Sequence, residues 1–149
     1  MRAMDLASAT ALAKILVTIE PWSRLKFSSI AVSQGLTPGR EQGARSWCLT
    51  VAGEAAGAVV VRDKWLRGPY LAHLSVVPAH QRHGLGRLAI DWWEGAARRA
   101  GAQNLWLCVS SFNAPALAFY QRAGFRKSGL LHDLLVDGLD EVLMRKQLT

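Results

Sequence analysis

The sequence predicts a single α/β (α+β) domain that spans residues 1–149. Three observations support this fold class. Hydrophobic residues make up 50% of the chain and charged residues 19%, a balance typical of a folded protein. One long segment has a clear helical amphipathic pattern, and several short β-branched runs are separated by glycine or proline. No repeat or linker divides the chain, so one core is expected.

The first half of the chain predicts two helices and three strands. Apolar residues at helical spacing indicate a helix from Ser8 to Ile19 that stops before Pro21. A second helix is expected from Ser28 to Gln34, with Gly35 as its C-terminal cap. The runs WCLTV and AGAVVV, separated by Gly53-Glu54, indicate a hairpin, and PYLAHLSVV indicates a third strand that ends at Pro78.

The second half begins with the amphipathic segment after Gly84. Its apolar stripe faces away from Arg87, Asp91, Glu94 and Arg98, which predicts two i,i+4 ion pairs, Arg87 with Asp91 and Glu94 with Arg98. Gly101 closes this helix. A buried strand, NLWLCVS, a helix capped by Asn113 that ends at Gly124, and two closing strands near residues 125–131 and 141–146 complete the expected fold.

Composition limits the function classes. Eighteen basic and eleven acidic residues give a formal charge of +7, which favours anionic partners. The chain has no Lys/Arg-rich run and no zinc-finger spacing, so no nucleic-acid partner is expected. Asp5 and Lys14 interrupt the first apolar segment, so we expect no signal peptide, no membrane partner and a cytoplasmic location. Cys48 and Cys108 are expected to be buried reduced thiols.

The stretch PAHQRHGLGR, residues 78–87, predicts an anion-binding turn. It lies between a strand and a helix, where the first backbone N–H groups of the helix have no intrahelical partner and the helix dipole adds positive charge. Glycines at 84 and 86 would let a ligand approach these groups without meeting a Cβ atom. A pyrophosphate is the expected anion.

Two common phosphate motifs do not fit this turn. A P-loop needs Lys followed by Ser or Thr after the second glycine, whereas Arg87-Leu88 stands there. The segment from Gly84 to Ala89 matches G-x-G-x-x-A, but a dinucleotide fold needs an acidic residue after the next strand, and that strand ends in Ser110-Ser111.

Two motifs resemble those of the GNAT superfamily of N-acetyltransferases. QRHGLG, Gln81 to Gly86, is similar to the Q/R-x-x-G-x-G/A signature, and NAPALAFYQRAGF, Asn113 to Phe125, is similar to the segment that follows it in the family. The resemblance covers about residues 47–146. It implies a mixed, mostly antiparallel sheet with splayed central strands and about four flanking helices. The family's first strand would have to fit into Met1 to Leu6, so it is expected to be short or absent.

The resemblance implies acetyl-CoA as the donor cofactor. Its pyrophosphate would lie on the turn, and its pantetheine arm would pair with the preceding strand. Tyr120 would donate a proton to the departing thiolate, Asn113 would contact the cofactor arm, and the N–H near Val76 would polarise the thioester carbonyl. The expected cofactor-binding residues are Leu74, Ser75, Val76, Gln81, Arg82, His83, Gly84, Leu85, Gly86, Arg87 and Asn113.

Several of these residues also have simpler explanations. Arg82 and Arg87 could be solvated surface residues, Asn113 could only cap a helix, and Tyr120 could only pack in the core. The spacing His80-x-x-His83 resembles a metal pair, but no further ligand lies close in sequence, so no metal site is expected.

The general base and the acceptor are less well defined. Between Asp63 and Asp91 the sequence has no acidic residue, which leaves His73 as the nearest titratable candidate on the central strand; Glu20, Glu54, Asp133 or a water chain are alternatives. By alternation His73 could face away from Leu74 and Val76 and serve only as a core or surface residue.

The acceptor is expected between residues 20–24 and a closing loop from Leu131 to Asp140, with Trp22 and Trp65 as candidate wall residues. Four acidic residues in and beside that loop favour a cationic amine such as a polyamine, an aminoglycoside, lysine or a protein N-terminus: Asp133, Asp137, Asp140 and Glu141. The prediction is an N-acetyltransferase, monomeric or homodimeric. The alternatives are a non-catalytic acyl-CoA-binding module and a nucleic-acid binder that uses the +7 charge.

Overall fold

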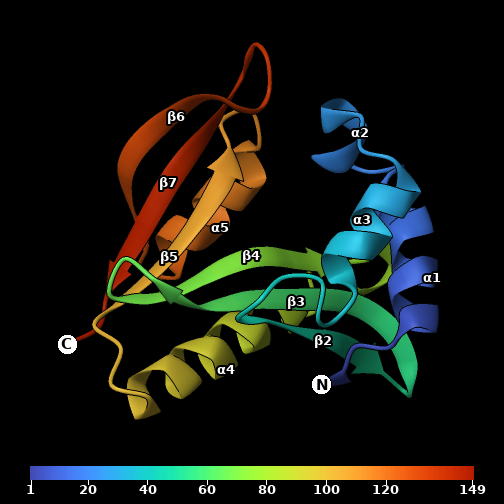
Figure 1. The fold of residues 1–149 in the computed structure, drawn as a ribbon, viewed down its shortest axis with the longest axis horizontal. Helices are drawn as coiled ribbons and strands as arrows, with labels where there is room; N and C mark the ends of the chain where they lie inside the picture. Colours follow the sequence, from blue (N-terminus) through green and yellow to red (C-terminus); the bar gives the residue numbers. More distant parts are fainter.

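Seven strands form one sheet in the computed structural model, which describes residues 1–149 (Figure 1). The strand order is β1-β2-β3-β4-β5-β7-β6, and every neighbouring pair is antiparallel except β4 and β5. This mixed, mostly antiparallel sheet confirms the expected fold class. The strands are β1 (Arg2–Ala3), β2 (Ala44–Val51), β3 (Glu54–Trp65), β4 (Gly68–Val76), β5 (Asn104–Ser110), β6 (Arg126–Val136) and β7 (Leu139–Gln147).

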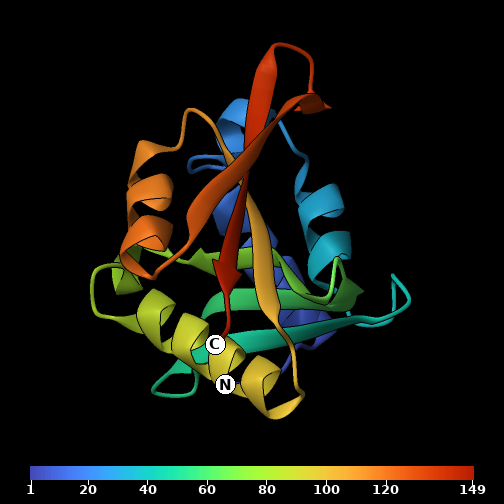
Figure 2. The same cartoon turned by 90° about the vertical axis from the view of Figure 1, so that its left-hand side faces the viewer.

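Helices cover both faces of the sheet. On one face, α1 and α3 enclose a core of 11 buried residues that includes Leu12, Leu36 and Val60. On the other face, α4 and α5 enclose a core of 16 buried residues that includes Trp93 and Leu107. Figure 2 shows α5 and α3 on opposite sides of the strands. The helices are α1 (Leu6–Leu16), α2 (Trp22–Leu25), α3 (Ser29–Leu36), α4 (Leu85–Arg99) and α5 (Ala114–Arg122), with a 3-10 turn at Pro78–His80. None of them is both long and apolar enough to cross a membrane.

Helix boundaries differ from the sequence-based expectation where capping decides them. The Asp5 side chain accepts from the Ser8 backbone N–H (2.7 Å), so α1 begins before Ser8 and ends before Ile19. Gly35, expected as a C-terminal cap, lies inside α3. The chain also forms the one-turn helix α2, which no periodic pattern in so short a segment could indicate.

The expected short first strand is present as β1, which has only two residues. It pairs Arg2 with Cys48 and Ala3 with Trp47 on β2. Both cysteines are free thiols, as expected; Cys48 is buried and Cys108 is partly buried.

The closing strands correct the expected loop. Residues 131–140 do not form an open connection, because β6 continues to Val136 and β7 begins at Leu139. Only Asp137 and Gly138 lie between them, and Gly138 takes the positive φ (+81°) that such a tight turn requires. Strands β6 and β7 therefore form a long hairpin at one edge of the sheet (Figure 1).

The central strands diverge, and this divergence positions the site. The parallel strands β4 and β5 pair only at Tyr70 with Trp106 and at Leu71 with Leu107. Strand β4 then runs on to Val76 without a partner on that edge, while the β5–β7–β6 layer tilts away (Figure 1). The result is an opening in the middle of the sheet with unpaired backbone on one side.

Candidate active site

A cavity of about 980 Å³ lies where β4 and β5 diverge. Its walls come from the α1–α2 connection, α3, β4, β5, the start of α5 and the β6–β7 hairpin. This volume suits a small-molecule site. Seven of the predicted site residues line it: His73, Leu74, Ser75, Val76, Gln81, Asn113 and Tyr120.

The turn before α4 presents backbone donors without partners. Gly84 is the N-cap of α4 with φ +85°, and the first intrahelical bond is from the Leu88 N–H to the Gly84 carbonyl (3.0 Å). None of the six backbone N–H groups from Arg82 to Arg87 donates to an acceptor of the protein. Unpaired backbone donors and the dipole at a helix N-terminus favour an anion, so the turn suits a group such as a pyrophosphate.

Side chains around this turn hold its shape. The Gln81 side chain donates from Nε2 to the Val76 carbonyl (2.9 Å), which ties the turn to the end of β4. A Cβ atom on Gly86 would lie 3.3 Å from the Phe119 ring, so this glycine also lets α4 pack closely against α5. Arg87 forms the expected ion pair with Asp91 (2.9 Å), which occupies part of its guanidinium.

The remaining turn residues contribute through their backbone. Arg82 has a positive φ (+63°), and Leu85 directs its side chain to a smaller apolar pocket that also contains Leu88 and Trp92. No group of three His, Cys, Asp or Glu side chains, near His80 and His83 or elsewhere, is arranged to hold a metal ion.

The free edge of β4 offers further donors. The Val77 N–H points toward β3, where it donates to the Ala56 carbonyl (2.8 Å). Because successive residues of a strand direct their backbone groups to opposite edges, the N–H groups of Val76 and Leu74 point into the opening between β4 and β5. This unpaired edge fits an extended amide-containing chain such as a pantetheine arm.

Tyr120 and Asn113 reach the cavity from α5. The Tyr120 side chain is 8% exposed and packs edge-on against Phe119 and Phe125, with ring centroids 5.0 and 5.8 Å away. Burial raises the pKa of the Tyr120 hydroxyl, so it remains protonated at neutral pH. The Asn113 side chain accepts from the Ala116 N–H (3.3 Å), so it acts as the helix cap and also borders the cavity.

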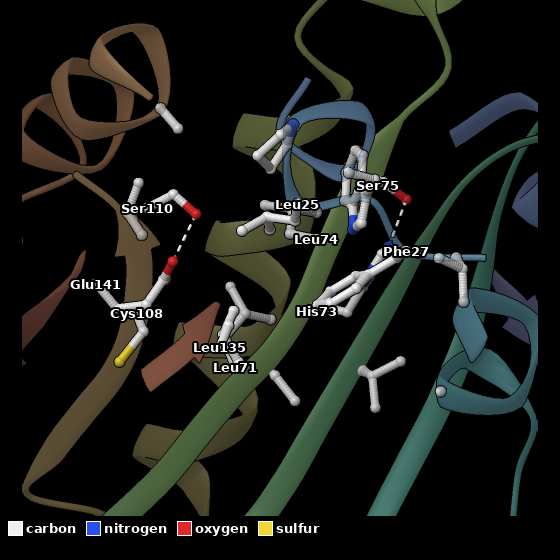
Figure 3. A pocket seen from close by; sticks show the side chains of 18 of the residues that line it. Leu25, Phe27, Leu71, His73, Leu74, Ser75, Cys108, Ser110, Leu135 and Glu141 are labelled. Atoms are coloured by element: carbon white, nitrogen blue, oxygen red, sulfur yellow. Dashed lines mark hydrogen bonds between the residues drawn. The ribbon is translucent and has the colours of Figure 1, made fainter. Parts of the chain in front are cut away.

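His73 lines the opposite wall. Its Nε2 atom lies 2.8 Å from the Ser75 hydroxyl (Figure 3). Its ring centroid lies 5.2 Å from that of Trp22 on α2. Leu74 and Val76 pack with the core under α4 and α5, so His73 lies on the other face of the sheet, as alternation predicts. Burial lowers the pKa of His73 to about 4, which makes it neutral and only weakly basic.

The expected acceptor walls are partly correct. Residues Glu20 to Trp22, together with Leu134 and Leu135 of β6, line the cavity. Trp65 does not, since it packs against Tyr70 and Trp106, with ring centroids 5.0 and 5.4 Å away.

The acidic residues at the end of the chain separate into two groups. Asp133 accepts from the Gly138 N–H (2.6 Å) and Asp140 contacts His132 (3.1 Å), so both stabilise the hairpin. Neither they nor Asp137 nor Glu54 line the cavity. Among the residues counted as the acidic loop, only Glu141 does.

Glu141 is the residue whose position the sequence reasoning missed. It lies in β7 and is only 3% exposed, and its Oε1 atom accepts a hydrogen bond from the Ser110 hydroxyl (2.6 Å; Figure 3). Burial raises the pKa of its carboxyl group, although the Ser110 bond opposes the rise. The sequence did contain a signal for the direction of this side chain. Val142 and Met144 form an apolar face of the strand, so Glu141 must point to the opposite face of the sheet.

The splayed central strands and the turn with unpaired N–H groups are typical of one class of protein, the acetyltransferases. In this class the acetyl donor binds beside the central strands. A model of the Acetyltransferase (GNAT) family matches residues 10–125. The chain belongs to this family, which confirms the resemblance drawn from its motifs.

Relatives in sequence include two acetyltransferases. The chain is 38% identical over 79 residues to streptothricin acetyltransferase of Streptomyces lavendulae, a match that covers 52% of this chain but only 42% of that protein. It is 29% identical over 128 residues to the [Ribosomal protein bS18]-alanine N-acetyltransferase of Escherichia coli (strain K12), covering 83% of this chain and 78% of that one.

Solved structures share the fold. Nourseothricin acetyltransferase is 34% identical with a TM-score of 0.65, over 71% of this chain and 66% of that one. The ribosomal-protein-S18-alanine N-acetyltransferase from Escherichia coli superposes with a TM-score of 0.77 at 21% identity, over 99% and 92%. A structure from Bacillus anthracis str. Ames in complex with acetyl coenzyme A has a TM-score of 0.67 at 15% identity, over 77% and 67%.

Proposed function

We propose that the chain is an acetyl-CoA-dependent N-acetyltransferase that transfers an acetyl group directly to a primary amine. The observation that carries the proposal is the run of six unpaired N–H groups from Arg82 to Arg87 beside the unpaired edge of β4. Family membership supports it, as do the names of the two relatives and the acetyl coenzyme A bound in a protein of the same fold.

Donor binding would use backbone groups more than side chains. The turn from Gln81 to Arg87 would hold the pyrophosphate, and the edge from Leu74 to Val76 would pair with the pantetheine arm. Acetyl-CoA would supply the activated acetyl thioester. The Val76 N–H points into the opening, where it can donate to the thioester carbonyl oxygen as negative charge develops there.

Two side chains are assigned proton-handling or positioning roles. Tyr120 keeps its proton because burial raises its pKa, so its hydroxyl can donate to the sulfur that leaves. His73, predicted as a base, has its pKa lowered by burial to about 4, which favours a neutral hydrogen-bonding role with Ser75 at the acceptor wall.

The test measures thiol release from acetyl-CoA with a panel of amines: polyamines, aminoglycosides, lysine and N-terminal peptides. Turnover that depends on one class of amine is expected. Tyr120→Phe, which removes only the hydroxyl, should lower kcat by about 100-fold without weakening acetyl-CoA binding. Tyr70→Phe is the control, because it removes the hydroxyl of another, half-buried tyrosine of the cavity wall and should leave kcat unchanged.

A second measurement separates catalysis from binding. Acetyl-CoA should raise the Tm of the protein, because a ligand of the native state stabilises it. A rise in Tm without turnover of any amine would support the acyl-CoA-binding module instead, and no rise would contradict the donor site.

The proposal includes a cytoplasmic location and a monomeric or homodimeric state. The free thiols of Cys48 and Cys108 suit a reducing compartment. Fractionation of the cells that produce the protein and light scattering of the purified chain would test the two statements separately.

A further inference from the structure

We propose that Glu141 receives the ammonium group of the acceptor amine and takes the proton that must leave before the amine can attack. This inference rests on the proposed N-acetyltransferase function and assigns the proton acceptor within it.

The charges in the cavity single out Glu141. Three carboxylates line the cavity, and two have cationic partners: Glu20 lies 3.4 Å from Arg24, and Glu41 lies 2.9 Å from Arg62. Glu141 has only the Ser110 hydroxyl. A buried carboxylate without a counter-ion is unfavourable, so an arriving ammonium would supply the missing charge.

Three titratable side chains of the cavity wall near Glu141 carry no charge at neutral pH. Burial raises the pKa of the Tyr70 hydroxyl and the Cys108 thiol and lowers that of His73. Tyr120, across the sheet, is also protonated. On the same face of β7, the Arg145 guanidinium is occupied, since it donates to the Asn104 side chain (2.7 Å). Arg40 and Arg62 also line the cavity, but no cationic side chain forms an ion pair with Glu141, so its carboxylate lacks a charged partner.

The position of Glu141 suits proton removal. It lies opposite Ser110 in the β5–β7 ladder, at the end of β5 and just before the helix that carries Tyr120. Val109 and Val142 pack in the core under α5, so Ser110 and Glu141 face the other side of the sheet, toward the cavity. The proposed proton acceptor and the proposed proton donor thus approach the opening from opposite faces.

The raised pKa of Glu141 strengthens it as a base. Burial makes its carboxylate hold a proton more tightly than an exposed one, yet its side chain stays in contact with the cavity. A lysine amine or an α-amine is mostly protonated at neutral pH, with pKa values of about 10.4 and 8. Some group in the site must accept that proton.

Each proton in the transfer has a donor and an acceptor. One N–H bond of the ammonium breaks and an O–H bond forms on Glu141, which later releases this proton to solvent through the cavity. The neutral nitrogen forms its bond to the acetyl carbon as the carbon–sulfur bond breaks. Tyr120 gives its proton to the sulfur, and the second proton lost by the nitrogen restores the Tyr120 hydroxyl.

The experiment compares wild type with Glu141→Gln, which keeps the size and the hydrogen bond to Ser110 but cannot take a proton. We expect kcat/KM for the amine found in the panel to fall about 100-fold at pH 7. The Kd of acetyl-CoA should stay the same. Glu141→Asp should recover part of the loss. Asp137→Asn is the control, because it removes an exposed carboxylate from the same hairpin and should leave kcat/KM unchanged.

The pH dependence distinguishes a proton acceptor from a residue that only supports the fold. Glu141→Gln cannot deprotonate the bound ammonium, so it must bind amine that is already neutral in solution. That neutral fraction rises about tenfold per pH unit below the pKa of the amine, and the kcat/KM of the variant should rise with it. The deficit relative to wild type should shrink accordingly. It should also shrink for a fluorinated acceptor analogue whose amine is already neutral at the assay pH.

Two outcomes would overturn the inference while leaving the proposed function intact. One is that wild type turns over an amine and the kcat/KM of Glu141→Gln for that amine equals the kcat/KM of Asp137→Asn. The other is a deficit that is the same at every pH and for both amines. If wild type neither binds acetyl-CoA nor turns over any amine, the proposed function fails instead.

Discussion

Ser110 opposes the effect of burial on the pKa of Glu141 through a single hydrogen bond. The hydroxyl donates to the Glu141 carboxylate (2.6 Å) and so stabilises its charged form. Removing the hydroxyl leaves burial, which raises the pKa, unopposed. The neighbouring Ser111 is exposed and uses only its backbone N–H, which donates to the Asp140 carbonyl (2.8 Å).

Ser110→Ala should therefore move the acid limb of the kcat/KM profile to higher pH. Activity requires the ionised carboxylate, and the substitution makes that form harder to reach. The measurement is kcat/KM against pH for wild type, Ser110→Ala and the control Ser111→Ala. An acid limb at the same pH in all three proteins would show that another group determines it.

Glu141 should also lower the stability of the fold at neutral pH. Burial places its folded-state pKa above the unfolded value, so the folded state binds the proton more tightly. The contribution of this group to stability is then fully present below the unfolded pKa and is lost as the pH rises through the folded pKa. The loss grows with the separation between the two pKa values.

Glu141→Gln should consequently raise the Tm at pH 7 while it lowers activity. The difference in Tm from wild type should disappear near pH 3, where the carboxyl is protonated in both states. Thermal unfolding at several pH values measures it, with Asp137→Asn as the control. A Tm below that of wild type at pH 7 would indicate that the carboxylate supports the fold instead.

At the level of elements, capping and local pattern made most of the fold predictable. Apolar and β-branched runs located β2, β3, β4 and β5, and the amphipathic stripe located α4 with both of its ion pairs, at 2.9 and 2.7 Å. The bounds of α1 and α3 were wrong where capping decides them, and the closing strands were wrong where tertiary contacts decide. The extension of β6 to Val136 depends on pairing with β7, which no local pattern in residues 131–140 indicated.

The turn before α4 gives a prediction with a matched control in the same helix. Gly84 and Gly101 stand at its two ends, both with positive φ (+85° and +74°) and both with open space where a Cβ would lie. Alanine at either position should cost about 1–2 kcal/mol of stability, because an L side chain disfavours this conformation.

Only one of these substitutions should affect the donor. Gly84→Ala adds a methyl group beside the unpaired N–H groups and should weaken acetyl-CoA binding about tenfold, whereas Gly101→Ala should not. Calorimetric Kd values, together with the Tm of each variant, would check this. Equal Kd values would argue against pyrophosphate binding at this turn.

At the level of the whole molecule, two residue pairs join the parallel central strands. We expect acetyl-CoA to complete the sheet across the opening. The amides of Leu74 and Val76 should exchange hydrogen quickly in the free protein and slowly with acetyl-CoA. The Ser75 amide, which points toward β3, should be protected in both states. Hydrogen exchange resolved by residue measures this, and unchanged rates at Leu74 and Val76 would contradict pairing with the pantetheine arm.

The donor and acceptor sides of the site differed in how well the sequence predicted them. The donor side is local, because the turn and the β4 edge occupy consecutive residues with a recognisable motif. The acceptor side brings together Trp22, His73, Ser110 and Glu141 from four separate segments. A contact between Ser110 and Glu141 depends on strand register, so the sequence alone placed Glu141 beside an acidic loop and not opposite Ser110.

The long β6–β7 hairpin, which carries part of the acceptor wall, has a consequence for diversification. Leu134 and Leu135 face the cavity from a strand at the edge of the sheet, far along the chain from the donor turn. New side chains at these two positions can change which amine enters while the thioester end of the site keeps its shape. A single scaffold could in this way acquire new acceptors one substitution at a time, without first losing its hold on the acetyl donor.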